Sequence, residues 1–572
     1  MMGLFRRKTI ENIQRDAHGG AGSHLKRSLG AIDLVTLGIG AIIGAGIFAT
    51  VGTASAGDAS RLGAGPSLML SFAITAVVCA FTALCYAEMA SMVPISGSAY
   101  TYSYATLGEL IAWIIGWDLI LEYAVGNVAV AISWANYFRS LLESVGIHVP
   151  LWLATDYRTA AKIPGLYEAA PHLFDVPIVF NLLAFLIVAI LTVVLVWGIK
   201  ESARFTAVMV GIKIVTLLFF VGFAFWLVSP AEMVANWQPF QPNGWAGTFA
   251  GAAIVFFAFI GFDAVSTLAE ETKRPARDLP IGLIASLVIC TVFYIVVSAV
   301  FTGILPYHVL KEKLATEQAE PLTMALQYRA PDAIWASGIV ALGSVIAHTA
   351  VLLVFQLGQA RIFFSISRDG LLPKVFSRVH PRFRTPYINT IIIGLLVGVT
   401  AAFTTIDEMV DLTNIGTLFA FILVCIGIPV LRYREPERHR PFRVPLGPWL
   451  FPILGVASCL FLMMYLPPAS WWRFVGWLVF GLSIYSAYGF TRSALWKGER
   501  RTTLPGKILA SGFFLVALGL FTVPHDAGPA ALVEAALTVG VPSHGTALAG
   551  LLLVGIGAAL CLVGRAIRRV RK

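Results

Sequence analysis

The sequence predicts a polytopic membrane protein built from α-helices. Of its 572 residues, 58% are hydrophobic and only 13% are charged, whereas a soluble protein is about half apolar and about a quarter charged. So few charges cannot cover a soluble surface of this size. The chain also contains fourteen apolar segments of roughly the length, about 20 residues, that crosses a bilayer. The composition excludes a disordered, collagen-like or disulfide-scaffold protein.

The expected spans follow one another along nearly the whole chain. They are residues 31–52, 66–93, 111–140, 178–197, 205–228, 247–269, 281–305, 333–364, 388–404, 409–431, 449–466, 472–490, 507–523 and 546–564. Residues 1–30 are expected to form an N-terminal tail, and residues 565–572 a basic C-terminal end.

The positions of the cationic residues predict the orientation of the spans. Of the 41 Lys and Arg residues, 31 lie in alternate connecting segments that begin with residues 1–30 and end with residues 565–572. Cytoplasmic segments carry the excess of Lys and Arg, so both termini are expected in the cytoplasm. The net charge of +10 is therefore interpreted as a topology signal, and no nucleic-acid partner is expected.

The cysteines give no indication of a metal or redox site. All six lie in apolar segments, without CxxC or Cys/His ligand spacing, and are interpreted as small buried hydrophobic residues. The two longest outer segments, 144–177 and 306–332, contain no Cys that could tether a partner subunit. No cofactor or metal is expected. Because no catalytic motif such as GxSxG or HExxH is present, the chain is not expected to be an enzyme.

The first span contains four glycines in nine residues, within the run GIGAIIGAGIF at residues 38–48. Gly weakens a helix by up to about 1 kcal/mol relative to Ala. The run can be a close-packing face of small residues. Alternatively, it can be an unwound stretch, which survives at membrane depth only beside a protein-lined cavity.

The sixth span contains a second irregular stretch, FFAFIGFDA at residues 256–264. A pair of interrupted helices five spans apart indicates a transporter built from inverted repeats, with its binding site between the two breaks. The first repeat would be residues 31–228 and the second residues 247–431, followed by additional spans within 449–564. Half-helix ends offer N–H groups to an anion and C=O groups to a cation, which suits a zwitterionic amino acid.

Among the ionisable residues expected inside the membrane, four matter most for function. Lys213 lies in the middle of the fifth span; it either extends to the interface or is buried and paired, and a buried Lys is suited to losing and regaining a proton during transport. Asp118 and Glu122 share one face of the third span and either form interhelical hydrogen bonds or line a polar pathway. Asp263 either caps the broken sixth helix or takes part in gating and proton handling.

Several stretches resemble the amino acid–polyamine–organocation (APC) superfamily and, within it, the cationic amino acid transporter (CAT) family. They are LKRSLGAIDL (25–34), GIGAIIGAGIF, YAEM (86–89), PISGSAY (94–100), FFAFIGFDA, RDLP (277–280) and SRDGLLP (367–373). The resemblance covers roughly residues 25–490.

This resemblance implies a LeuT-like fold, with spans 1–5 and 6–10 as inverted repeats. It places the substrate carboxylate at Ala45 and Gly46, with a carbonyl from Ile42. It places the substrate ammonium at the carbonyls of Phe257, Ala258 and Ile260. Lys213 matches the Lys of proton-coupled relatives, and Glu122 and Asp263 are expected to contribute to proton coupling.

The expected function is secondary active uptake of L-amino acids, coupled to protons, by alternating access in the plasma membrane (bacterial inner membrane). Bulky Phe355, next to the predicted side-chain pocket, favours small neutral substrates. A permease or exchanger for Arg and Lys is the close alternative. An amino-acid-binding sensor or channel is the alternative from another class. The expected partners are the amino acid, H⁺ and membrane lipid, without a disulfide-linked heavy chain.

Overall fold

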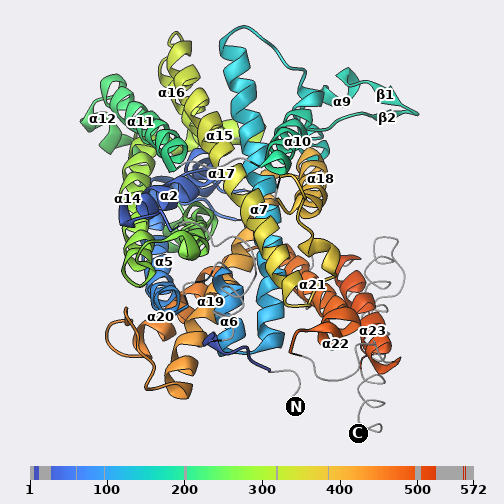
Figure 1. The fold of residues 1–572 in the computed structure, drawn as a ribbon. Helices are drawn as coiled ribbons and strands as arrows, with labels where there is room; N and C mark the ends of the chain where they lie inside the picture. The colour runs from blue at the N-terminus through green and yellow to red at the C-terminus, as the bar shows by residue number, and fades with distance from the viewer. Residues whose placement is uncertain are drawn as a thin grey trace, which may run out of the picture.

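The computed structural model describes most of the chain as a helical bundle (Figure 1). The described residues are 6–11, 27–58, 61–93, 95, 97–198, 203–316, 320–383, 385–495 and 504–522, with 558 and 561 as single residues. Within them the regular structure is helical except for one hairpin of β1 (His172–Leu173) and β2 (Val176–Pro177), which a purely α-helical prediction did not include. The predicted span 546–564 and the end 565–572 lie outside the described residues, apart from 558 and 561.

The long apolar helices and several shorter ones follow the predicted spans. The uninterrupted ones are α5 (Leu68–Met92), α7 (Glu109–Ser144), α10 (Leu182–Trp197), α11 (Ala203–Leu227), α14 (Pro275–Ile304), α17 (Ile334–Arg368), α18 (Tyr387–Phe403), α19 (Ile406–Arg434), α20 (Leu450–Met463) and α23 (Leu504–Thr522). A further one is α21 (Pro468–Ile484), which continues as η6 (Tyr485–Gly489) and α22 (Phe490–Arg492). Eight described helices are long and apolar enough to cross a membrane, and five shorter apolar helices accompany them.

Two further helices are interrupted. The first consists of α2 (Ala31–Ile42), α3 (Ala45–Phe48) and α4 (Thr50–Ala56), and the second of α13 (Gly244–Val255), η3 (Phe256–Phe259) and η4 (Asp263–Glu271). Shorter elements connect the long helices. They are η1 (Gly65–Ser67), α6 (Ser98–Thr106), η2 (Leu151–Leu153), α8 (Tyr157–Ala160), α9 (Leu166–Ala169), α12 (Pro230–Asn236), α15 (Tyr307–Thr316), α16 (Pro321–Arg329) and η5 (Lys374–Ser377).

The long helices pack in pairs that lie five predicted spans apart. Helix α7 packs chiefly on α17, α5 on α14, and α10 on α18; α7 and α17 cross near the centre of Figure 1. Helix α7 and the segment from α13 to η4 are almost fully enclosed, whereas α11 and α14 expose much of their apolar surface. Such large apolar surfaces mark contact with lipid or with another protein, so the interrupted helices belong to the protein-lined centre.

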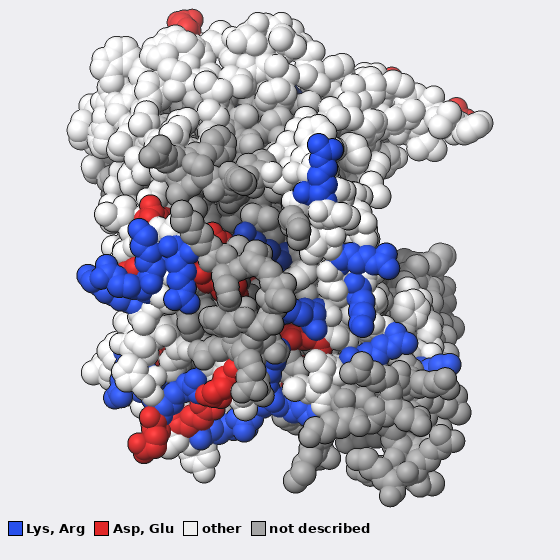
Figure 2. Space-filling view, in the orientation of Figure 1, with Lys and Arg blue, Asp and Glu red and all other residues white. Residues whose placement is uncertain are grey.

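Charged residues are distributed unevenly along the bundle. On the face shown in Figure 2, Lys and Arg side chains gather in the lower half, and the upper half shows few of them. The lower half contains α6, α22 and the loop between α19 and α20 (Figure 1). These elements border the segments that the charge pattern predicts to be cytoplasmic, and the uneven distribution agrees with that prediction.

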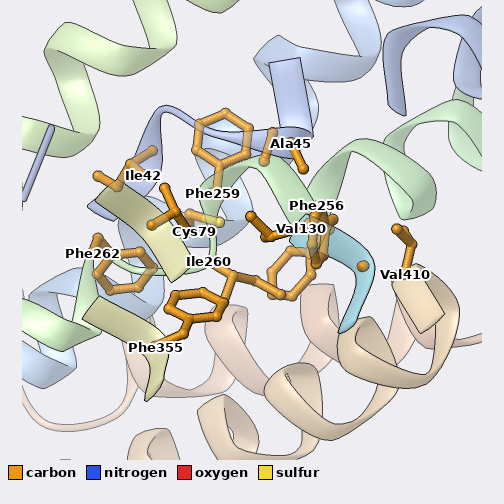
Figure 3. Close-up of a cluster of buried hydrophobic side chains, with 14 of the residues drawn as sticks. Ile42, Ala45, Cys79, Val130, Phe256, Phe259, Ile260, Phe262, Phe355 and Val410 are labelled. Atoms are coloured by element: carbon orange, nitrogen blue, oxygen red, sulfur yellow. The ribbon is translucent and has the colours of Figure 1, made fainter. Parts of the chain in front are cut away.

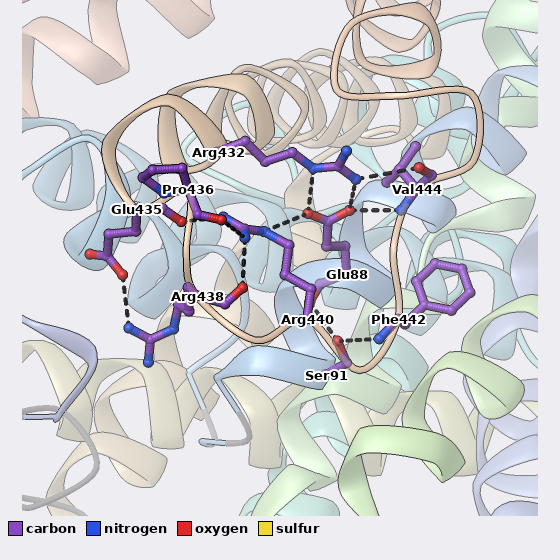
Figure 4. A network of polar contacts seen from close by, with 9 residues as sticks. All are labelled: Glu88, Ser91, Arg432, Glu435, Pro436, Arg438, Arg440, Phe442 and Val444. Atoms are coloured by element: carbon purple, nitrogen blue, oxygen red, sulfur yellow. Dashed lines mark hydrogen bonds and ion pairs between the residues drawn. The ribbon is translucent and has the colours of Figure 1, made fainter.

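A buried carboxylate ties the lower end of α5 to the loop after α19 (Figure 4). Glu88 is fully buried and accepts hydrogen bonds from Arg432 at 2.9 and 2.5 Å. It also accepts a 2.7 Å bond from the backbone N–H of Val444, and Arg440 lies 3.6 Å away. The loop is therefore held by a charge that has no contact with water.

We expect Glu88→Gln to destabilise the protein by about 3 kcal/mol, because breaking a buried ion pair leaves the partner charge uncompensated. The measurement is thermal unfolding of the purified protein in detergent. Glu435→Gln is the matched control, since Glu435 pairs with Arg438 at the half-exposed edge of the same loop and exposed pairs contribute about 0–1 kcal/mol. Equal melting temperatures for the two variants would contradict this account.

A second buried carboxylate lies between α15 and α16, outside the membrane-spanning helices. Glu320 is 3.7 Å from Arg139, and burial raises its pKa from 4.5 to about 7, although Arg139 opposes the shift. Because the folded state holds this proton more tightly than the unfolded state, the contribution to stability is present below about pH 4.5. It is lost as pH rises to about 7.

We expect the melting temperature of Glu320→Gln to depend less on pH than that of the wild type between pH 5 and 8. The control is Glu143→Gln, because Glu143 is half-exposed. Parallel curves of melting temperature against pH for the wild type and Glu320→Gln would disprove this.

Candidate functional site

The first helix is interrupted for two residues at its middle. Helix α2 ends at Ile42, Ile43 is extended, and α3 begins at Ala45 after Gly44. A Cβ atom on Gly44 would lie 2.8 Å from a methyl carbon of Val351 on α17, so a larger residue here would require that side chain to move. The helix therefore continues through the first glycines of the predicted run and breaks at Ile43 and Gly44.

The sixth predicted span is interrupted at the corresponding place. The segment η3 ends at Phe259, Ile260 is extended, and Gly261 has φ +117°. A side chain at Gly261 would be strained at this backbone angle, and its Cβ would approach the carbonyl oxygen of Ala41 to 2.8 Å. The paired interruption expected from the sequence is present in the structure.

The two interruptions lie against each other. A Cβ atom on Gly46 would lie 2.1 Å from the Cα atom of Ala258. The hydroxyl of Tyr294, on α14, lies 2.9 Å from the carbonyl oxygen of Ile42 and 2.8 Å from that of Ala258. A hydroxyl has one proton to donate, so the two carbonyls share it. Tyr294 thus links the two unwound segments, a role that was not predicted.

The six residues predicted to hold the substrate gather at this junction and are all buried. They are Ile42, Ala45, Gly46, Phe257, Ala258 and Ile260. Figure 3 shows buried apolar side chains at this junction, with Phe355 of α17 lying beside Ile260. The ring of Phe355 also packs on Tyr123, and a Cβ on Gly126 would come within 2.9 Å of it. Apolar side chains therefore pack next to the unwound backbone on this side.

Lys213 is directed at the first interruption and not at the membrane surface. Its side chain is fully buried, and Nζ donates hydrogen bonds to the carbonyl oxygens of Gly40 at 2.6 Å and Ile43 at 2.9 Å. These carbonyls lack a helical partner because the helix ends between them. The ammonium thus supplies donors to carbonyl groups that the broken helix leaves without partners. A change in its charge would therefore weaken these two hydrogen bonds.

The predicted acidic residues are buried below this junction. Asp263 is the first residue of η4; its carboxylate lies against the backbone N–H groups of Gly261 and Ala264, while Oδ2 has no hydrogen-bond partner. Glu122 lies near Asp263 and Thr417. One helical turn away, both carboxylate oxygens of Asp118 lack a partner. This region holds more polar groups than it satisfies, which is typical of a site that takes up protons, water or a ligand.

On the side that the topology predicts to be outer, a vestibule of about 780 Å³ opens between α4, α7, α15 and the start of α19. Arg61 lies at its wall and pairs with both Asp58 and Asp411 at 2.6 Å. Asp411 follows Val410, which lies in the apolar cluster of Figure 3. The vestibule is thus adjacent to the unwound segments.

At the opposite end, the N-terminal segment crosses the helix ends. Arg6 pairs with Glu109 at 2.8 Å, and Lys8 pairs with Asp369 at 2.9 Å. These contacts tie the start of α7 and the end of α17 together. The structure therefore combines an open outer vestibule with ion-paired inner helix ends.

His348 is buried in the core, close enough to Lys213 for the two to interact electrostatically. Its Nε2 lies 2.7 Å from the hydroxyl of Ser133, and its Nδ1 lies 2.5 Å from the carbonyl oxygen of Ser344. Across the part of the chain that the structure describes, no three His, Cys, Asp or Glu side chains are grouped as metal ligands. The polar groups of the site are thus backbone amides, Lys213, Tyr294 and the carboxylates.

Comparison with known proteins identifies the family. A family model described as amino acid permease matches residues 29–470. The chain is 45% identical over 492 residues to the branched-chain amino acid permease BcaP of Bacillus subtilis (86% of this chain, 99% of the relative). It is 42% identical over 495 residues to the methylthioribose transporter of the same organism (86% and 100%). It is 37% identical over 439 residues to the vacuolar cationic amino acid transporter 4 of Arabidopsis thaliana (76% and 68%). The chain therefore belongs to the amino acid permease family, within the APC superfamily that its motifs resemble.

Proposed function

We propose that this protein is a secondary active transporter that takes up L-amino acids by alternating access, coupled to protons. The observation that carries the proposal is the contact between two interrupted helices, whose backbones meet at Gly46 and Ala258. The N–H groups at the start of α3 would bind the substrate carboxylate. The carbonyls of Ile42, Phe257, Ala258 and Ile260 would accept hydrogen bonds from its ammonium.

The apolar surroundings favour a substrate with a neutral side chain of small or medium size. Phe355 fills the space between Ile260 and Tyr123, where a long cationic side chain would need both room and an acidic partner. The branched-chain permease among the relatives agrees with this preference. Cationic amino acids are the second candidate, because the CAT-type relatives carry that name and Glu122 lies one turn from Gly126, on which Phe355 packs.

The arrangement of helices supports a LeuT-like fold. Residues 31–228 would form one repeat and residues 247–431 the inverted second repeat, since α5, α7 and α10 each pack on the helix five spans later. The protein would lie in the bacterial inner membrane with both termini in the cytoplasm and fourteen spans in all. The outer vestibule and the ion-paired inner end would then represent an outward-facing conformation.

Proton coupling would use the buried ionisable groups. Lys213 holds the first interruption through the carbonyls of Gly40 and Ile43, so losing its proton would loosen this segment. Glu122 and Asp263 lie below the junction and would tune or exchange that proton. No bound metal ion or heavy chain is part of this proposal.

The deciding experiment is uptake of labelled L-alanine into sodium-free proteoliposomes under an inward proton gradient, with excess L-leucine or L-arginine as competitor. Gradient-driven uptake that leucine suppresses and arginine does not would support the proposal. Suppression by arginine would transfer the specificity to cationic substrates. Binding of amino acid without uptake or trans-stimulated exchange would instead indicate a sensor, and conduction without a fixed stoichiometry a channel.

We expect Tyr294→Phe to weaken apparent substrate affinity about tenfold, because it removes the hydroxyl that links the two unwound segments, and a buried hydrogen bond is worth about 1–1.5 kcal/mol. The measurement is the concentration dependence of uptake. Tyr328→Phe is the control, since Tyr328 on α16 is 39% exposed. An unchanged KM and maximal rate in Tyr294→Phe would exclude the linking role.

A further inference from the structure

A second hollow lies far from the unwound segments, on the face of α14 that points away from the centre of the bundle. It is a groove of about 710 Å³, formed by one side of α14 and by the loop between α19 and α20. The helix contributes Pro280, Ile284 and Val288, and the loop contributes Pro441 and Phe442. We call it the α14 groove.

The α14 groove has a fixed wall. Phe442 donates its backbone N–H to the hydroxyl of Ser91, and Val444 donates its own to Glu88. The same loop is held by the Arg432 and Arg440 contacts of Figure 4. These contacts hold the loop in place beside α14, so the groove has a well-defined wall.

The length and position of the α14 groove match one leaflet of a bilayer. From Arg277 to Ile289 the helix rises about 18 Å, and half of the hydrocarbon core is about 15 Å thick. The deep end is lined by aliphatic side chains, among them Ile289 and Val288, which are 36% and 56% exposed. An extended acyl chain fits this shape and chemistry.

The mouth of the α14 groove is cationic. Arg277 lines it, Arg443 follows Phe442 in the loop wall, and Lys273 and Arg274 precede Arg277 at the start of α14. All four are exposed, and none forms an ion pair with another residue in the described part of the chain. Asp278, the acid of the same helical turn, is buried. The mouth therefore presents a cluster of exposed cations at the predicted cytoplasmic edge of the membrane, next to the partly exposed Glu270 and Glu271 that precede it in the chain.

We propose that the α14 groove binds an anionic phospholipid, with its phosphate at Arg277 and one acyl chain along α14. Anionic lipids lie in the cytoplasmic leaflet and attract cations at this level. Because the groove wall is the loop that Glu88 holds, a bound lipid would stabilise the contact between α5, α14 and this loop.

The test is native mass spectrometry of the full chain in detergent, with phosphatidylglycerol or phosphatidylcholine carrying identical acyl chains. We expect preferential retention of phosphatidylglycerol, weakened about fivefold in Arg277→Gln, the effect of one cation at a membrane surface, and lost in Ala285→Trp, which fills the groove without changing charge. Arg378→Gln, an exposed cation of another predicted inner loop, should retain the lipid like wild type.

Each deviation has a definite meaning. Equal retention of the two lipids by the wild type would overturn the charge recognition. Wild-type retention by Arg277→Gln or by Ala285→Trp would overturn the groove as the site. Loss in Arg378→Gln equal to that in Arg277→Gln would show that net charge alone attracts the lipid, and would also overturn it. A thermal melt of each variant without added lipid separates these results from misfolding.

Discussion

Replacing Lys213 by Ala is expected to abolish gradient-driven uptake while leaving a folded protein. The substitution removes the donor to the carbonyls of Gly40 and Ile43 and leaves both acceptors buried without a partner. It also removes the charge that the proposed mechanism switches. The measurement is uptake of labelled amino acid into proteoliposomes with and without an inward proton gradient, across pH 5.5 to 8.

The design separates loss of coupling from loss of folding. Lys311→Ala is the matched control, because Lys311 is an exposed lysine at the outer vestibule, and it should transport as the wild type does. Size-exclusion behaviour and melting temperature of Lys213→Ala report on folding. Full uptake by Lys213→Ala with an unchanged pH dependence would refute the assigned role. A folded variant that still exchanges amino acid but no longer accumulates it would support coupling most directly.

The interrupted helices could be predicted from sequence because each carries residues that an ordinary membrane helix avoids. The residues at which the first helix is interrupted could not be predicted in the same way. Gly38 and Gly44 look alike in the sequence, but a Cβ on Gly38 would meet Ser286 of α14 within a helix that continues, whereas Gly44 lies at the break itself. Close packing and unwinding use the same residue type, and only the neighbouring helix distinguishes them.

Tyr294 shows a second limit of sequence reasoning. A lone Tyr in an apolar helix indicates that its buried hydroxyl needs a hydrogen-bond partner, but the same holds for Tyr86, Tyr102 and Tyr137. The structure gives Tyr137 the carbonyl oxygen of Phe48 and leaves the hydroxyls of Tyr86 and Tyr102 without a partner. Which tyrosine reaches both breaks depends on how α14 packs against α2 and η3, and this is set by tertiary packing.

Lys213 was easier to place because a charge in the membrane has few tolerable surroundings. The sequence left open whether Lys213 extends to the interface or is buried and paired, and the structure shows it buried, with the carbonyl oxygens of Gly40 and Ile43 as partners that the sequence did not identify. The carboxylates were harder, since Asp118, Glu122 and Asp263 can each be satisfied in several ways. The structure shows Asp263 against backbone N–H groups and both oxygens of Asp118 without a partner, a difference that depends on the backbone at Gly261 and on Gly416 facing Asp118.

Replacing Gly46 by Ala is expected to reduce uptake about a hundredfold or more. The added methyl group would lie 2.1 Å from the Cα atom of Ala258 and 2.4 Å from its Cβ, so the conflict is with backbone and cannot be relieved by rotating a side chain. Overpacking costs about 1–3 kcal/mol where neighbours can yield. Here relief requires the two interrupted helices to move apart, which separates the N–H groups of α3 from the carbonyls of η3.

The matched control is Gly211→Ala in α11, where a Cβ would meet nothing within 4 Å. That variant should keep full uptake, because Ala favours a helix over Gly. Uptake kinetics of both variants, together with their melting temperatures, make the comparison. If Gly46→Ala transports like Gly211→Ala, the two breaks do not need to touch during transport, and the substrate cannot be held between them as proposed. If it folds but no longer binds amino acid, the contact at Gly46 and Ala258 is what brings the two halves of the site together.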